Sequence, residues 1–121
     1  CSQRSISNWV SKCMTTDIGY YFNMDQIKAD PWNSPEKMWQ HSPLKYANMA
    51  KTPTLFIQSD EDYRCWMGDA IQMFSALKYF GVEARMCLFH GENHELSRSG
   101  KPKHRIRRMT EMMEWFEKYL K

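Results

Sequence analysis

The chain has 121 residues, of which 42% are hydrophobic and 14% aromatic, and these proportions suit one globular domain better than a disordered chain. No run approaches the roughly 18 to 20 apolar residues that a membrane-spanning helix needs, so we expect no membrane partner. The formal net charge of +3 is mild, and most of the excess lies in one segment, residues 98–108.

The first part of the chain predicts short elements separated by turns. Residues 1–5 are expected to be the end of an element that begins earlier. Residues 5–8 (SISN) are capping residues, and they predict a short helix through Cys13. Residues 17–43 are expected to be irregular, because the three steps Asp-Pro, Ser-Pro and Ser-Pro are stop or turn signals. Within this stretch, Ser34 and Pro35 predict the N-cap and first position of another short helix.

The second part alternates predicted strands and helices. A continuous apolar run predicts a buried strand over residues 51–57, and residues 82–89 predict the next strand. Apolar spacings of three and four predict an amphipathic helix over residues 67–80. A loop is expected over residues 90–102, followed by a last helix over residues 103–120. The order strand, helix, strand, helix predicts an α/β fold with a parallel pair of strands. The apolar stripe of the last helix is expected to consist of Ile106, Met109, Met113, Phe116 and Leu120.

Polar residues follow both predicted strands. Asp62 comes shortly after the first strand, and His94 lies 32 residues later, just past the second. In open α/β sheets, ligands gather beyond the carboxyl ends of the strands. Neighbouring strands lie about 4.8 Å apart, so loops that leave the same ends can bring the two side chains into hydrogen-bond contact.

An acid followed by a histidine is the late half of the Ser…Asp…His chain order of serine hydrolases. In that chemistry the histidine accepts the proton of the serine hydroxyl, and the carboxylate holds the histidine in the required tautomer. The serine itself, on a Gly-x-Ser-x-Gly turn, is not found in the chain. Taken singly, Asp62 is also compatible with an acid before a helix, and His94 with an ordinary loop histidine.

Two segments around these residues resemble a known family. They are residues 58–65 (QSDEDYRC) and 91–100 (GENHELSRSG), with further similarity at 3–9 (QRSISNW) and 17–21 (DIGYY). The chain resembles the prolyl oligopeptidase family of serine peptidases over its whole length, and in particular the acylaminoacyl-peptidase-like branch. One departure is Trp66, where relatives usually have a proline.

The resemblance implies an α/β-hydrolase catalytic domain that follows a β-propeller, and hydrolysis of short peptides or N-acylated aminoacyl peptides through an acyl-enzyme. It assigns Asp62 as the triad acid, His94 as the triad base, and Arg64 as a residue that binds a substrate carbonyl. We therefore expect residues 1–121 to be a single domain, the C-terminal fragment of a peptidase catalytic domain. The nucleophile strand and the propeller are expected to be absent, so the fragment alone is expected to be inactive.

No cofactor is expected. A metal site among the histidines and acids of residues 90–104 is not favoured, because the HExxH pattern is missing. The four cysteines, Cys1, Cys13, Cys65 and Cys87, show no CxxC spacing, and we expect free thiols in a reducing, cytoplasmic environment.

The expected partners are a peptide substrate in the full-length enzyme and a second copy of the fragment, bound over an exposed sheet edge and the aromatic stretch near Trp32 and Trp39. Two other functions stay open at this point. One is a non-catalytic truncated paralogue that acts as a peptide- or protein-interaction module. The other is a small nucleic-acid-binding protein that uses the basic residues 98–108, although a solvated loop and helix start explains these charges more simply.

Overall fold

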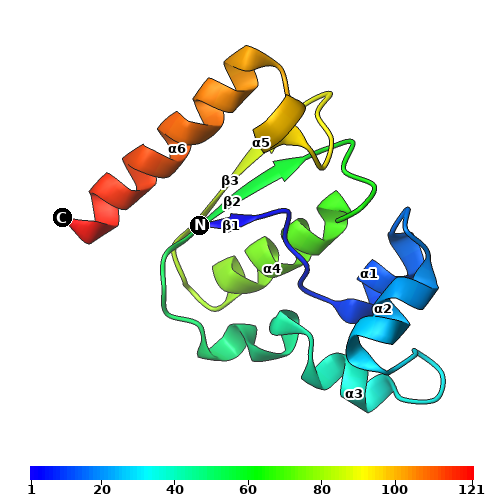
Figure 1. Ribbon diagram of the computed structural model, residues 1–121. Helices are drawn as coiled ribbons and strands as arrows, with labels where there is room; N and C mark the ends of the chain where they lie inside the picture. Colours follow the sequence, from blue (N-terminus) through cyan, green and yellow to red (C-terminus); the bar gives the residue numbers. More distant parts are fainter.

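A three-stranded parallel sheet lies at the centre of the computed structural model, which describes all of residues 1–121 (Figure 1). Its strands are β1 (Ser2–Gln3), β2 (Thr54–Ser59) and β3 (Ala84–Phe89), in the order β1-β2-β3. β2 and β3 pair in register from Thr54 opposite Ala84 to Ser59 opposite Phe89. The parallel pair predicted from the sequence is therefore confirmed, and both strands end at the same edge of the sheet.

Helices cover both faces of this sheet. Figure 1 shows α6 on one side of the strands and α4 on the other, with α1 to α3 grouped beyond α4. None of the helices combines the length and the apolar character needed to cross a lipid bilayer. The helices are α1 (Trp9–Thr15), α2 (Tyr20–Ile27), α3 (Pro35–Gln40), the 3-10 helix η1 (Pro43–Met49), α4 (Met67–Tyr79), α5 (Leu96–Ser99) and α6 (Pro102–Leu120).

Alternate residues of β2 supply the two main core clusters, because successive side chains of a strand point to opposite faces. Leu55 and Ile57 pack with Trp115 of α6, whereas Phe56 packs with Ala70 and Leu77 of α4. Both faces of β2 are thus buried, which explains why its sequence reads as a continuous apolar run.

The apolar stripe expected on α6 is confirmed only at Phe116, which packs against the core, whereas the other four residues are exposed. Ile106 is 68% exposed and faces away from the sheet, whereas Trp115 is 8% exposed and packs against it. The buried face of α6 also includes Met112 and Tyr119, which share a spacing of three and four with Trp115. A helical period of 3.6 allows two apolar stripes on this helix, and the aromatic one meets the strands.

Two α-helices and the 3-10 helix η1 lie where the sequence predicted none. α2 interrupts the stretch expected to be irregular, and α5 forms inside the loop expected over residues 90–102. α2 begins after Gly19, whose φ of 83° is one that glycine adopts without the strain that a side chain causes. Cys13 packs with Ala29 and Met38 in a third core cluster, so contacts between α1 and α3 stabilise the segment that contains α2.

Candidate active site

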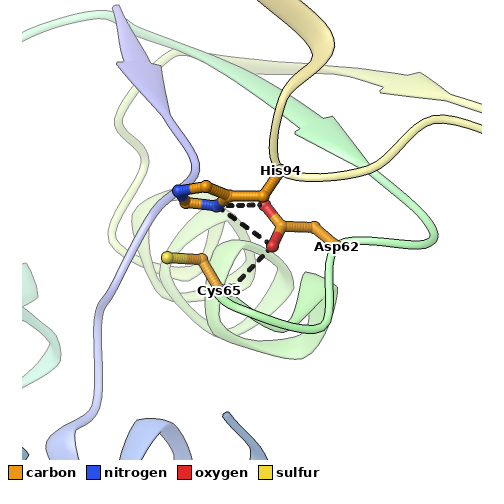
Figure 2. Close-up of side chains that lie close together, drawn as sticks. All are labelled: Asp62, Cys65 and His94. Atoms are coloured by element: carbon orange, nitrogen blue, oxygen red, sulfur yellow. Dashed lines mark hydrogen bonds and ion pairs between the residues drawn. The ribbon is translucent and has the colours of Figure 1, made fainter. Parts of the chain in front are cut away.

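An aspartate and a histidine meet beyond the carboxyl ends of β2 and β3 (Figure 2). The Nδ1 atom of His94 lies 3.2 Å from Oδ1 and 3.1 Å from Oδ2 of Asp62. Asp62 is 1% exposed, whereas the His94 side chain remains 24% exposed. The predicted contact between these two side chains is therefore confirmed, with the carboxylate buried and the imidazole open to one side.

Backbone amides hold Asp62 in place. The chain turns after β2, and Oδ1 of Asp62 accepts hydrogen bonds from the N–H groups of Arg64 (3.0 Å) and Cys65 (2.8 Å). The carboxylate of Asp62 thus stabilises the turn that follows it and also faces the imidazole. Two amide donors on one oxygen fix the position of the carboxylate, so it can orient a histidine.

Contacts with Asp60 hold the beginning of the loop that carries His94. Gly91 takes a φ of 69°, and its N–H donates to Oδ1 of Asp60 at 2.8 Å. Nδ1 of His90 lies 2.6 Å from Oδ2 of the same carboxylate. The hydrogen bond with His90, followed by that from Gly91, lowers the pKa of Asp60. The loops that follow β2 and β3 are also joined by the N–H of Glu61, which donates to the carbonyl of Glu92 at 3.0 Å.

A buried acid fixes the other end of that loop. Oε1 of Glu92 accepts a hydrogen bond from the N–H of Lys101 at 3.0 Å and lies 2.6 Å from Nδ1 of His104. Burial tends to raise the pKa of Glu92, but the hydrogen bonds from Lys101 and His104 together bring it below its usual value. Glu92 thereby ties the His94 loop to the start of α6.

This geometry defines what the imidazole can do. A carboxylate only accepts hydrogen bonds, so the proton of a neutral His94 belongs on Nδ1, and the lone pair of Nε2 is left to accept a proton. The pair of side chains can therefore act as an oriented general base. No serine is among the residues that line the pockets beside His94.

Two residues beside the pair were not singled out as functional by their sequence context. Cys65 is 5% exposed, and its Sγ lies 3.7 Å from Nζ of Lys12, itself buried on α1. Nζ also donates to Oγ1 of Thr16 at 3.2 Å and to the carbonyl of Arg64. Burial raises the pKa of the Cys65 thiol, and the nearby charge of Lys12 opposes that rise. The sequence signal for Cys65 was its place three residues after Asp62.

A pocket of about 600 Å³ opens beside the exposed side of His94. The short helices α1 and α2 supply half of its lining residues, so the helix missed in the sequence forms part of the site. Its apolar lining residues include Ile6, Trp9, Ile18, Tyr21 and Phe22.

Arg64 lines this pocket and a smaller polar one of about 210 Å³, and His94 lines both. Nε of Arg64 lies 2.6 Å from Oδ1 of Asp17, and its second guanidinium nitrogen lies 3.3 Å from Oδ2. The hydrogen bond from Arg64 is the main cause that lowers the pKa of Asp17. Asp17 thus holds the guanidinium near the imidazole, and no sequence pattern predicted this pairing.

Trp66 occupies the N-cap position of α4, where a proline was expected from the resemblance. Its ring packs over Gly68, so closely that a side chain at position 68 would collide with it. Trp66 does not line either pocket beside His94. The departure at this position therefore changes the start of α4 rather than the space beside the imidazole.

Comparison with known proteins places this geometry in a family. The model of the prolyl oligopeptidase family matches residues 1–121. The uncharacterized peptidase YuxL of Bacillus subtilis is 43% identical over 119 residues, which are 98% of this chain and 18% of that protein.

Solved structures agree with the sequence comparisons. The acylaminoacyl peptidase of Pyrococcus horikoshii superposes with a TM-score of 0.91 at 36% identity, over 96% of this chain and 19% of that one. An acylaminoacyl peptidase in complex with Z-Gly-Gly-Phe-chloromethyl ketone has a TM-score of 0.90 at 36% identity, over 95% of this chain and 19% of that one. The chain thus spans about a fifth of the length of these relatives. It has the fold of part of an α/β-hydrolase domain, and it belongs to the prolyl oligopeptidase family.

Proposed function

We propose that this chain supplies the acid and the base of a serine peptidase active site. Asp62 is the triad acid, His94 is the triad base, and the serine comes from the preceding part of the catalytic domain in a longer protein. The observation that carries the proposal is the buried carboxylate of Asp62 within 3.1 Å of Nδ1 of a partly exposed imidazole. Membership of a family with peptidase relatives supports the same reaction.

Each side chain has a defined role in this reaction. Nε2 of His94 accepts the proton of the serine hydroxyl as the oxygen attacks the scissile carbonyl, and then donates it to the leaving amine. The carboxylate of Asp62 stabilises the imidazolium that forms in between. Water then attacks the acyl-enzyme with His94 again acting as the base. The chain on its own lacks the nucleophile, so we expect no turnover from it.

The pocket beside His94 supports a peptide substrate with an apolar side chain. The indole of Trp9 and the rings on α2 line a space of about 600 Å³, and buried apolar area is the main source of binding energy for such a side chain. A relative is in complex with a peptidyl chloromethyl ketone that ends in phenylalanine, which fits the same class of ligand. The proposed role of Arg64, which Asp17 holds at 2.6 Å, is to donate to a substrate carbonyl. Short peptides or N-acylated aminoacyl peptides are therefore the proposed substrates.

The test is a chimera. In the Bacillus subtilis relative, the 119 matching residues are replaced by this chain, and hydrolysis of chromogenic aminoacyl substrates is measured. We expect activity, and we expect His94→Gln and Asp62→Asn each to reduce kcat by about 10³- to 10⁴-fold. His41→Gln and Asp25→Asn change exposed residues of the same types and serve as controls.

A fluorophosphonate probe separates the base from the nucleophile. We expect the isolated chain to remain unlabelled and the active chimera to be labelled at one serine. Stoichiometric labelling of the isolated chain, or full activity of the His94→Gln chimera, would contradict the proposed roles.

A further inference from the structure

Three different metal-ligating groups converge at the edge of the sheet. A carboxylate oxygen of Asp62, Sγ of Cys65 and an imidazole nitrogen of His94 all lie within 4.8 Å of one another (Figure 2). We propose that Asp62, Cys65 and His94 form a binding site for a thiophilic divalent cation, with Zn²⁺ bound in preference to Mg²⁺ or Ca²⁺.

The separations suit a single ion. Zinc bonds to nitrogen and oxygen at about 2.0 to 2.2 Å and to sulfur at about 2.3 Å, so two ligands on one tetrahedral ion lie about 3.3 to 3.6 Å apart. Nδ1 of His94 is already 3.1 Å from Oδ2 of Asp62. Only the thiol has to approach, by at most about 1.2 to 1.5 Å, and rotation of a cysteine side chain provides a movement of that size. Three protein ligands leave one position of the ion open for water.

The protons and charges balance on binding. Cys65 loses its thiol proton to solvent, and the proton on Nδ1 of His94 is replaced by one on Nε2, so the imidazole stays neutral. A dication, a carboxylate and a thiolate then sum to zero charge, and the ammonium of Lys12 beside the thiol adds one positive charge to the surroundings. Lys12 donates to Sγ of Cys65, and a donor in this position stabilises a thiolate bound to a metal.

The donor set also determines which ion binds. One sulfur, one imidazole nitrogen and one carboxylate oxygen favour Zn²⁺, whereas Mg²⁺ and Ca²⁺ require oxygen ligands. The pocket of about 600 Å³ is lined by both Cys65 and His94, so it gives an ion a path from solvent.

Binding has a consequence that rests on the proposed function. An ion on Nδ1 of His94 and on Asp62 removes the hydrogen bond that orients the base, so Zn²⁺ would be a reversible inhibitor of the assembled peptidase. The binding itself does not depend on catalysis, and the test below measures binding to the isolated chain alone.

The test uses Co²⁺ as a spectroscopic substitute for Zn²⁺. All variants carry Cys1→Ser, because that exposed thiol is a competing ligand. We expect one equivalent of Co²⁺ to give a sulfur-to-cobalt charge-transfer band, which Cys65→Ser abolishes and Cys87→Ser preserves. Competition with Zn²⁺ should show an affinity at least about 100-fold weaker in Cys65→Ser, since even outer-sphere partners contribute about 10- to 100-fold.

Circular dichroism establishes whether each variant is folded. If Cys65→Ser does not fold, His94→Gln decides the question, because its side chain is partly exposed and it retains the thiol. We then expect weaker Zn²⁺ binding in His94→Gln. The proposal is overturned by a charge-transfer band that persists in Cys65→Ser, by the absence of any band in the parent protein, or by unchanged affinity in His94→Gln.

Discussion

The buried carboxylate of Asp62 has two separable tasks, and two substitutions distinguish them. One oxygen accepts the N–H groups of Arg64 and Cys65, at 3.0 and 2.8 Å, and the carboxylate also contacts His94. Asp62→Asn keeps an acceptor for both amides, whereas Asp62→Ala removes it. The bond from Cys65 is fully buried and that from Arg64 is partly buried.

The structure sets the expected size of the effect. A buried donor left without an acceptor costs about 1 to 3 kcal/mol, so two such donors, one of them only partly buried, cost about 2 to 5 kcal/mol. We expect the free energy of unfolding of Asp62→Ala to lie below that of Asp62→Asn by at least about 2 kcal/mol. The free energy of unfolding of most natural domains is about 5 to 15 kcal/mol, so a difference of about 2 kcal/mol is large.

Urea unfolding followed by tryptophan fluorescence measures the difference in stability between Asp62→Ala and Asp62→Asn, because the chain contains five tryptophans. Asp25→Ala, on a largely exposed side chain, should change the free energy of unfolding by less than about 0.5 kcal/mol. Equal stabilities of Asp62→Ala and Asp62→Asn would refute the reasoning, since the two amides would then not depend on this acceptor.

Three further predictions concern the core and the surface. Burial raises the pKa of Asp69 from 3.8 to about 6, so the folded state binds the proton of this carboxyl more tightly than the unfolded state. The protonated carboxyl therefore adds to the free energy of unfolding. This contribution is complete below about pH 4 and is lost as the pH rises through 6. In the parent protein, the free energy of unfolding should fall by about 3 kcal/mol from this cause between about pH 4 and pH 7, as measured in unfolding curves. Asp69→Asn should abolish this pH dependence. Trp115→Ala should lower the free energy of unfolding by about 3 to 5 kcal/mol, whereas Ile106→Ala should lower it by less than about 0.5 kcal/mol. Similar losses in the two variants would contradict the packing of α6 through Trp115. We also retain the prediction that the chain self-associates through the exposed sheet edge and the aromatic stretch near Trp32 and Trp39, and we expect Trp32→Glu with Trp39→Glu to shift light-scattering masses toward the monomer. A wild-type monomer at micromolar concentration would contradict this.

The alternation of strands and helices was predictable because its signals are local. The apolar run of β2 and the spacing in α4 both reflect burial of a face, and Pro35 marks the start of α3 through its fixed φ. The meeting of Asp62 and His94 was also predictable, because loops that leave neighbouring parallel strands at one edge are close together.

Other features depend on contacts that no local pattern encodes. The choice between two stripes on α6 is made by the shape of the sheet face that receives Trp115, and α2 is stabilised by packing among α1, α2 and α3. The Asp17–Arg64 pair joins residues 47 positions apart, and Lys12 reaches Cys65 across 53. Interactions between such distant residues appear only once the chain is folded.

The central claim is that Asp62 fixes the tautomer of His94, and the tautomer can be observed in the isolated chain. In ¹⁵N-labelled protein, one-bond couplings show which ring nitrogen carries the proton. We predict a proton on Nδ1 of His94 with a resonance shifted downfield by the carboxylate, and its loss in Asp62→Ala. A proton on Nε2 instead, or an unchanged His94 spectrum in Asp62→Ala, would contradict the account.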